Sequence, residues 1–169
     1  MKWLSVLALC FVLVFALGGQ LSAQTTQMTV KGILYQTGTP QVTVIDQDHW
    51  VAIVDYRGVK IDVSSPQVLA LTDMSADNKL VLFGEKNVIH DFGYLTLMDK
   101  DGDKMVWQIW DTPAAGPGKG GGKIVAATGK FEGAEGTIDT TTGDIANFKD
   151  GSIYLIGHCV EKLKFKAPL

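Results

Sequence analysis

The sequence predicts an all-β protein, either a barrel or a sandwich, and three observations support this fold class. About eight to ten short runs rich in β-branched and aromatic residues are separated by turn signals. No stretch beyond residue 23 shows the long apolar period of an amphipathic helix. Nine of the 19 glycines fall between Gly116 and Gly143, a concentration that favours tight turns and close approach of strands.

The first 23 residues have the layout of a secretory signal peptide, which we expect to be helical before its removal. Lys2 precedes an apolar run over residues 3–17, and Leu21-Ser22-Ala23 supplies small residues for cleavage. The run is shorter than the roughly 18–20 residues that a bilayer span needs. We therefore expect cleavage after Ala23, no stable membrane span afterwards, and a periplasmic or secreted protein. An uncleaved anchor is the other interpretation. Residues 24–169 then form a single domain.

Charge and cysteine content exclude several classes of function. The chain has 15 basic and 18 acidic residues and no basic cluster, which argues against nucleic acid and anionic lipid surfaces as partners. After signal cleavage Cys159 is the only cysteine, so the domain has no intrachain disulfide. Because Cys159 lies in an apolar run, we expect a small buried side chain rather than a reactive thiol or an intermolecular bridge.

In the first half of the domain we expect short strands separated by loops. Residues 36–40 read as a turn, Arg57-Gly58 as the turn of a hairpin, and residues 75–78 as a loop or single helical turn. The strands expected around them are 28–35, 42–45, 50–56, 59–63 and 79–83.

The second half shows clearer signals. Residues 94–98 and 105–110 form the best-defined hairpin, joined by a segment that contains Asp101-Gly102. A glycine cluster leads into a strand at 123–127, a tight turn at 128–131 and a returning strand from 134 to 140. Residues 140–151 read as a polar connection, and residues 152–165 as a long final strand.

Metal and cofactor sites are not expected. Asp99, Asp101 and Asp103 alternate around Gly102, but the glycine precedes the third acidic residue and no glutamate follows at the calcium-loop spacing. We expect a solvated hairpin tip, with weak calcium binding as the alternative. His158 and Cys159 are adjacent on one strand, so their side chains point to opposite faces and do not share a metal.

No nucleophile motif or phosphate loop is present, so the sequence predicts no catalytic residue. Two residues are predicted to contact a ligand. Glu161 lies on the otherwise apolar face of the final strand, where it either is solvated by a frayed or bulged strand or lines a cavity mouth. Trp107 and Trp110 lie on opposite faces of one strand. Either a second layer or a partner subunit covers the outside, or one of the two indoles faces a ligand space.

The run Ala126-Ala127-Thr128-Gly129-Lys130-Phe131-Glu132-Gly133-Ala134-Glu135-Gly136 resembles the Gly-Gly-Thr-Gly-(Lys/Arg)-Phe-x-Gly-Ala-x-Gly signature of the allene oxide cyclase and dirigent barrel superfamily. The acidic segment 99–103 before a tryptophan-containing strand is similar to a hairpin of secreted bacterial members. The resemblance covers residues 94–158, and two alanines replace the first two glycines, as in a divergent member. It implies a closed antiparallel barrel of about eight strands, calycin-like, with a central cavity and often a trimeric assembly.

The expected function is that of an exported barrel which binds an apolar small molecule in its cavity without turnover. One alternative is a cavity-type cyclase or isomerase of the allene oxide cyclase kind, with Glu161 as its polar group. The other alternative is an oligomeric cell-envelope component, since Trp107 and Trp110 face both sides of a strand. The residues do not identify the ligand.

Overall fold

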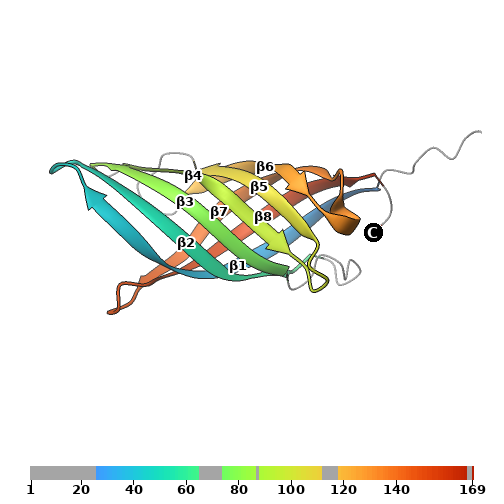
Figure 1. Ribbon diagram of the computed structural model, residues 1–169, viewed down its shortest axis with the longest axis horizontal. Helices are drawn as coiled ribbons and strands as arrows, with labels where there is room; N and C mark the ends of the chain where they lie inside the picture. The colour runs from blue at the N-terminus through green and yellow to red at the C-terminus, as the bar shows by residue number, and fades with distance from the viewer. Residues whose placement is uncertain (1–25, 65–73, 87, 112–117, 167–168) are drawn as a thin grey trace, which may run out of the picture.

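Eight strands form one closed antiparallel barrel in the computed structural model, which describes residues 26–64, 74–86, 88–111, 118–166 and 169 (Figure 1). Each strand pairs with the next, and the last pairs with the first. The predicted all-β closed barrel is confirmed, whereas the predicted signal peptide lies outside the described residues. The strands are β1 (Thr26–Val44), β2 (His49–Asp62), β3 (Met74–Glu85), β4 (Val88–Met98), β5 (Lys104–Asp111), β6 (Lys119–Ala127), β7 (Glu135–Asn147) and β8 (Ile153–Phe165).

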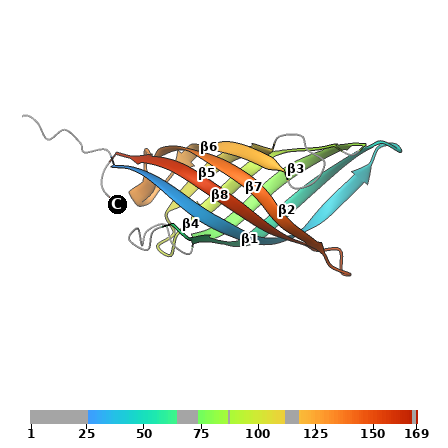
Figure 2. The ribbon, with the colours of Figure 1, turned by 180° about the vertical axis from the view of Figure 1, so that it is seen from behind.

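The barrel closes where the first and last strands meet, and Figure 2 shows β1 and β8 side by side. Their register runs from Thr26 opposite Phe165 to Gly38 opposite Ile153. We call the end at which β1 begins and β8 finishes the terminal end, and the opposite end the distal end. Among the described residues, no helix has the length and apolar character needed to cross a bilayer.

Two turns expected in the first half are strand instead. Residues 36–40 continue β1 into an arm that pairs only with β2 beyond Gly38, so the missing N–H of Pro40 lies on a strand edge, where proline is tolerated. Arg57-Gly58 continues β2. A Cβ at Gly58 would lie 1.8 Å from the Tyr35 carbonyl oxygen, so this glycine permits close approach of β1 rather than a reversal.

Two further segments expected as loops also belong to strands. Residues 75–78 start β3, in which Met74, Ala76 and Asn78 are buried on the inner face. Their polar neighbours face outward. Because Asn78 is polar yet faces inward, the sequence of this segment does not show the apolar-polar alternation expected of a strand. The threonine run after Thr140 continues β7 against β8, with a register shift between Thr142 and Ile145. β-branched threonines favour this extended conformation.

The hairpin and the glycine-rich corner of the second half are confirmed. β4 and β5 pair from Phe92 opposite Trp110 to Met98 opposite Lys104. The turn after β6 is a short 3-10 segment, η2 (Gly129–Phe131), which holds Phe131 fully buried against Phe165. This segment therefore places an aromatic side chain in the core at the terminal end of the barrel.

Large apolar side chains fill the barrel interior toward the terminal end. The principal core cluster contains Trp107, Leu95, Leu97 and Met105, and Cys159 is buried with them, as predicted. Burial raises the pKa of the Cys159 thiol to about 12, which keeps it protonated and unreactive at neutral pH. A second cluster lies nearer the distal end, where the packing is incomplete and leaves open space.

Candidate ligand-binding site

Two adjoining chambers lie inside the distal half of the barrel, with volumes of about 100 and 60 Å³. Side chains from β3, β4, β5, β7 and β8 line both. The residues common to the two chambers are Leu80, Asp91, Asp111, Thr142 and Leu155. The chambers thus surround one pair of aspartates, and we treat them as one candidate site.

The walls of the chambers are mainly apolar because inward positions alternate along each strand. Leucines and isoleucines from six strands form these walls, and Tyr56 of β2 adds an aromatic ring to the larger chamber. The apolar side chains are Leu34, Leu80, Leu82, Ile89, Leu95, Ile109, Ile145 and Leu155. A few polar groups set in such walls are typical of small-molecule sites.

Asp91 and Asp111 meet one position beyond the last paired residues of β4 and β5, Phe92 and Trp110. Their carboxyl groups lie close enough for each to shift the pKa of the other. Thr140 Oγ1 lies 3.5 Å from Asp111 Oδ1 and donates to it. The closing of the barrel therefore brings two acidic side chains together in one partly buried space.

The glycine cluster at the start of β6 makes room for this pair. A Cβ at Gly120 would lie 1.7 Å from Asp111 Oδ1, and one at Gly118 would lie 3.0 Å from Asp111 Oδ2. Only glycine at position 120 leaves the Asp111 carboxyl in its present place. This explains part of the glycine concentration that dominates the sequence beyond its midpoint.

Both aspartates have raised pKa values. Burial is the main cause for Asp91, followed by the negative charge of Asp111, and together they raise the pKa of Asp91 to about 7. Burial likewise raises the pKa of Asp111. Because two adjacent carboxylates repel each other, the pair retains one shared proton near neutral pH. A carboxyl with a pKa near 7 is suited to donate or accept a proton.

Two buried amide groups of the smaller chamber have oxygens without a partner in the described part of the chain, Gln36 Oε1 and Asn78 Oδ1. Gln36 is 1 % exposed, and its Nε2 donates to the Ala76 carbonyl oxygen at 3.0 Å. An unpaired buried acceptor costs about 1–3 kcal/mol, so a bound molecule or water that donates to these oxygens is stabilised there.

Glu161 is fully buried, which rules out the solvated interpretation. β8 continues regularly through this position, and Lys60 of β2 reaches across the intervening strand β1, where its Nζ donates to Glu161 Oε2 at 2.5 Å. Burial raises the pKa of Glu161, and the charge of Lys60 opposes that effect. The pair offsets the cost of an inward carboxylate. Glu161 is not among the residues that line the chambers, and its predicted contact with a ligand stays a prediction.

Trp107 and Trp110 do lie on opposite faces of β5. Trp107 is fully buried in the principal core cluster and is absent from the chamber lining, so its predicted contact with a ligand also remains a prediction. Trp110 is 44 % exposed on the outside, opposite Phe92 of β4. Phe92 and Tyr94 stack edge to face with ring centroids 6.0 Å apart, so β4 and β5 present an exposed aromatic surface.

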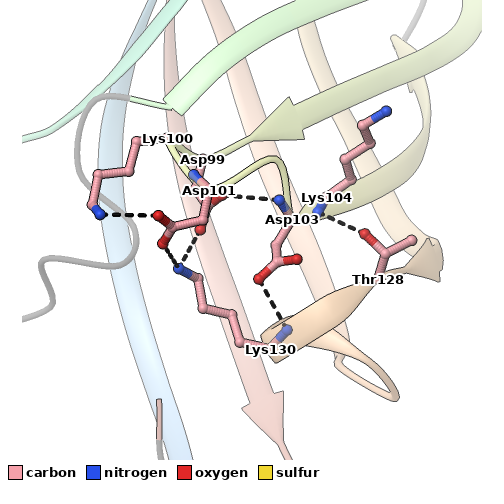
Figure 3. A network of polar contacts seen from close by, with 7 residues as sticks. All are labelled: Asp99, Lys100, Asp101, Asp103, Lys104, Thr128 and Lys130. Carbon is pink, nitrogen blue, oxygen red and sulfur yellow. Dashed lines mark hydrogen bonds and ion pairs between the residues drawn. The ribbon is translucent and has the colours of Figure 1, made fainter.

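The acidic hairpin between β4 and β5 binds a lysine of the same chain (Figure 3). Lys130 Nζ pairs with Asp99 and lies 3.0 Å from Asp101 Oδ2, while the Lys130 N–H donates to Asp103. Asp99 at the base of the turn is buried, whereas Lys100, Asp101 and Gly102 at the tip are exposed, as expected for a solvated hairpin tip. In the described ranges, no group of three or more acidic, histidine or cysteine side chains is arranged to hold a metal.

A larger depression of about 580 Å³ lies on the outside of β1, β7 and β8. Exposed charged side chains border it, including Lys164 and Glu135, whose Nζ and Oε2 atoms are 3.5 Å apart. Exposed ion pairs of this kind contribute little energy. The interior chambers, where two carboxyl groups are partly buried among apolar walls, are the better candidate for a binding site.

Comparisons with known proteins give matches among solved structures alone. No family model and no curated protein matches the chain. Among solved structures it is similar to two pterocarpan synthase dirigent proteins. One has 12% identity and a TM-score of 0.48, over 83% of this chain and 92% of that one. The other has 9% identity and a TM-score of 0.45, over 86% and 97% of the two chains. The predicted relationship to dirigent-like barrels and to allene oxide cyclases stays a prediction.

Sequence reasoning missed the aspartate pair, although a signal for it was present. Asp111 shares the inward face of Trp107 and Ile109, and Asp91 shares that of Gly93 and Leu95. Extending each face by one inward position would have placed both carboxyls inside the barrel. Their mutual contact, however, depends on the register of β4 and β5, which the sequence does not specify.

Proposed function

We propose that this chain is an exported β-barrel protein that binds one small, largely apolar molecule in the chambers beside Asp91 and Asp111, without turnover. The observation that supports this most directly is a partly buried carboxyl pair facing open space with apolar walls. Such groups are costly in a protein that never fills the space beside them. The predicted signal peptide at residues 1–23 supplies the export.

The chamber volumes limit the size of the molecule. A cavity of about 150 Å³ in a designed apolar core accommodates benzene. The two chambers, at about 100 and 60 Å³, are of that size class. Drug-sized ligands need about 300–1,000 Å³. We therefore infer a ligand, or the buried part of a ligand, with the dimensions of a single ring.

Fluorine NMR of para-fluorobenzyl alcohol with residues 24–169 tests this proposal. We expect its signal to broaden with the wild-type protein and to stay sharp with Leu155→Trp, which fills space common to both chambers. Ile53→Trp, at an exposed position of β2, is the matched control and should bind like the wild type. Equal broadening by all three proteins would show that the probe binds elsewhere and would contradict the proposal.

A second candidate function is proton-transfer catalysis, as in a cyclase or isomerase. The raised pKa of Asp91, about 7, favours it because general acids and bases work best near the ambient pH. In that case Asp91 and Asp111 would exchange their shared proton with the bound molecule. Isomerisation of a one-ring substrate that is lost in Asp91→Asn, while binding persists, would distinguish this function from binding alone.

We also propose that the barrel self-associates through the outside of β3, β4 and β5. Phe83, Phe92, Tyr94 and Trp110 are exposed there, and contiguous exposed aromatic side chains often mark interfaces. Sedimentation velocity of residues 24–169 should show an oligomer that Trp110→Lys weakens. A monomer at all concentrations would contradict this part of the proposal and with it the role as an oligomeric envelope component.

A further inference from the structure

The chambers combine several hydrogen-bond acceptors with no cation. Asp91 and Asp111 contribute two carboxyl groups, and Gln36 and Asn78 contribute amide oxygens without a partner. The described residues that line the two chambers include no lysine, arginine or histidine. Asp91, Asp111 and Tyr56 are their titratable members. The negative charge of Asp91 and Asp111 is therefore not neutralised by any basic side chain among the described residues that line the chambers.

The orientation of Gln36 is fixed by its neighbour. A backbone carbonyl only accepts hydrogen bonds, so the group 3.0 Å from the Ala76 oxygen must be the amide nitrogen of Gln36. Its amide oxygen is consequently held away from Ala76 and has no partner. An acceptor presented in this way, in a residue that is 1 % exposed, is satisfied by a donor inside the chamber, from water or from a bound molecule.

We propose that the molecule bound in the chambers is a primary organic ammonium whose charged group lies among Asp91, Asp111 and the Gln36 amide oxygen, with its apolar body against the leucine walls. This inference rests on the proposed function and specifies its ligand class. An ammonium group brings three N–H donors and a positive charge to a set of acceptors that carries negative charge. A hydroxyl group brings one donor and no charge.

Other chemical classes fit less well. A carboxylate or phosphate ligand would be repelled by the aspartates, since like charges in a desolvated space are strongly unfavourable. A calcium ion requires six to eight oxygen ligands. It would also leave the apolar walls, including Leu80 and Leu155, without a role. The combination of buried acceptors and apolar surface matches a cation that has a hydrocarbon body.

The test compares three probes of equal size that differ only in charge: para-fluorobenzylamine, para-fluorobenzyl alcohol and para-fluorobenzoate. Fluorine NMR titration of residues 24–169 gives each dissociation constant. At about pH 8 we expect the amine to bind about tenfold or more tighter than the alcohol, because charge-assisted hydrogen bonds exceed neutral ones by one to two kcal/mol. The benzoate should not bind.

Two variants assign the preference to the carboxyl pair. Asp91→Asn should reduce the preference for the amine to less than about threefold, since it removes one charge from the site. Asp55→Asn is the control, because Asp55 is exposed on the outside of β2, where it pairs with Lys79. The preference should also decrease at about pH 6, where the pair holds its shared proton and the amine remains charged.

Each other outcome has a defined meaning. Equal binding of amine and alcohol would overturn the ammonium inference and leave the small-molecule proposal intact. Binding of none of the probes would overturn both. If calcium chloride displaced the amine at matched ionic strength, the site would be one for a metal ion rather than for an organic cation. That result would likewise overturn the inference.

Discussion

Gly120 and Asp111 face each other across β6 and β5, so closely that a Cβ at position 120 would lie 1.7 Å from Asp111 Oδ1. The absence of a side chain on one strand thus determines where a carboxyl group on the next strand lies. Asp111 in turn contacts Asp91 and accepts from Thr140. The position of the whole acidic pair therefore depends on a residue that contributes no chemical group of its own.

Gly120→Ala should displace the Asp111 carboxyl. Overpacking of this kind costs about 1–3 kcal/mol, which urea unfolding would measure. Binding of para-fluorobenzyl alcohol should weaken as well. Gly121→Ala is the matched control, because its Cβ would be 3.6 Å from the nearest atom, in ordinary contact. If both substitutions had the same effect, the close approach of Gly120 would not determine the geometry of the site.

The raised pKa of Asp91 predicts that the protein becomes less stable as the pH rises from about 4 to about 7. In this range the unfolded chain has already lost the proton that the folded protein retains, so deprotonation favours unfolding. Asp91→Asn should flatten the dependence and stabilise the protein at about pH 8 by on the order of a few kcal/mol. Unfolding free energies at about pH 5 and pH 8 provide the measurement. Parallel pH profiles for the two proteins would contradict the assignment.

The buried pair of Lys60 and Glu161 predicts strong coupling between two strands far apart in sequence. Glu161→Leu leaves the Lys60 ammonium buried without a partner and should cost about 3–5 kcal/mol. The double variant with Lys60→Met should recover most of that loss, because apolar residues of similar volume often replace buried ion pairs without penalty. A double-mutant cycle by urea unfolding measures the coupling, and additive single effects would exclude it.

Lys130→Met should lower the thermal midpoint at neutral pH, because Lys130 holds η2 against the β4–β5 hairpin. Burial tends to raise the pKa of Asp99, but hydrogen bonds from Lys130 and from two backbone N–H groups outweigh it and lower that pKa. Because the pKa of Asp99 is lower in the folded protein than its value of about 3.8 in the unfolded chain, ionised Asp99 stabilises the fold at pH values above about 3.8. This stabilisation is lost as the pH falls and the folded carboxylate becomes protonated.

The Lys130→Met variant should consequently lose less stability than the wild type between about pH 7 and pH 3, as thermal melts at the two pH values would show. Lys100→Met serves as the control, since Lys100 is exposed and, within the described part of the chain, its ammonium bonds to Asp101 alone. An unchanged acid profile in Lys130→Met would contradict this role of the ion pair.

Much of the barrel could be predicted from the sequence, especially where turn chemistry is local. The β4–β5 hairpin follows from Asp101-Gly102, and the corner at η2 follows from Gly129 and Gly133, both of which adopt positive φ. Arg57-Gly58 was misinterpreted for a physical reason. A glycine that permits close approach of a neighbouring strand has the same sequence signal as a glycine in a turn.

The candidate site could be predicted only in part. Glu161 was noticed as a carboxylate on an otherwise apolar face, but neither interpretation offered for it included a buried ion pair, because its partner Lys60 lies 101 residues away and no local pattern relates the two. The pair of Asp91 and Asp111 depends in the same way on strand register. Contacts across a barrel are set by tertiary packing, whereas single-sequence patterns report mainly local geometry.

The pairing of β1 with β8 has a consequence for how the chain is made. A nascent polypeptide that lacks its last 13-residue strand has no partner for the free edge of its first, so it retains two unpaired edges. Ring closure must wait until β8 has been synthesised, and pairing of such remote segments is intrinsically slow. Until then both edges offer backbone groups to other chains, and a chaperone that shields the segment 26–38 during synthesis should raise the yield of folded protein.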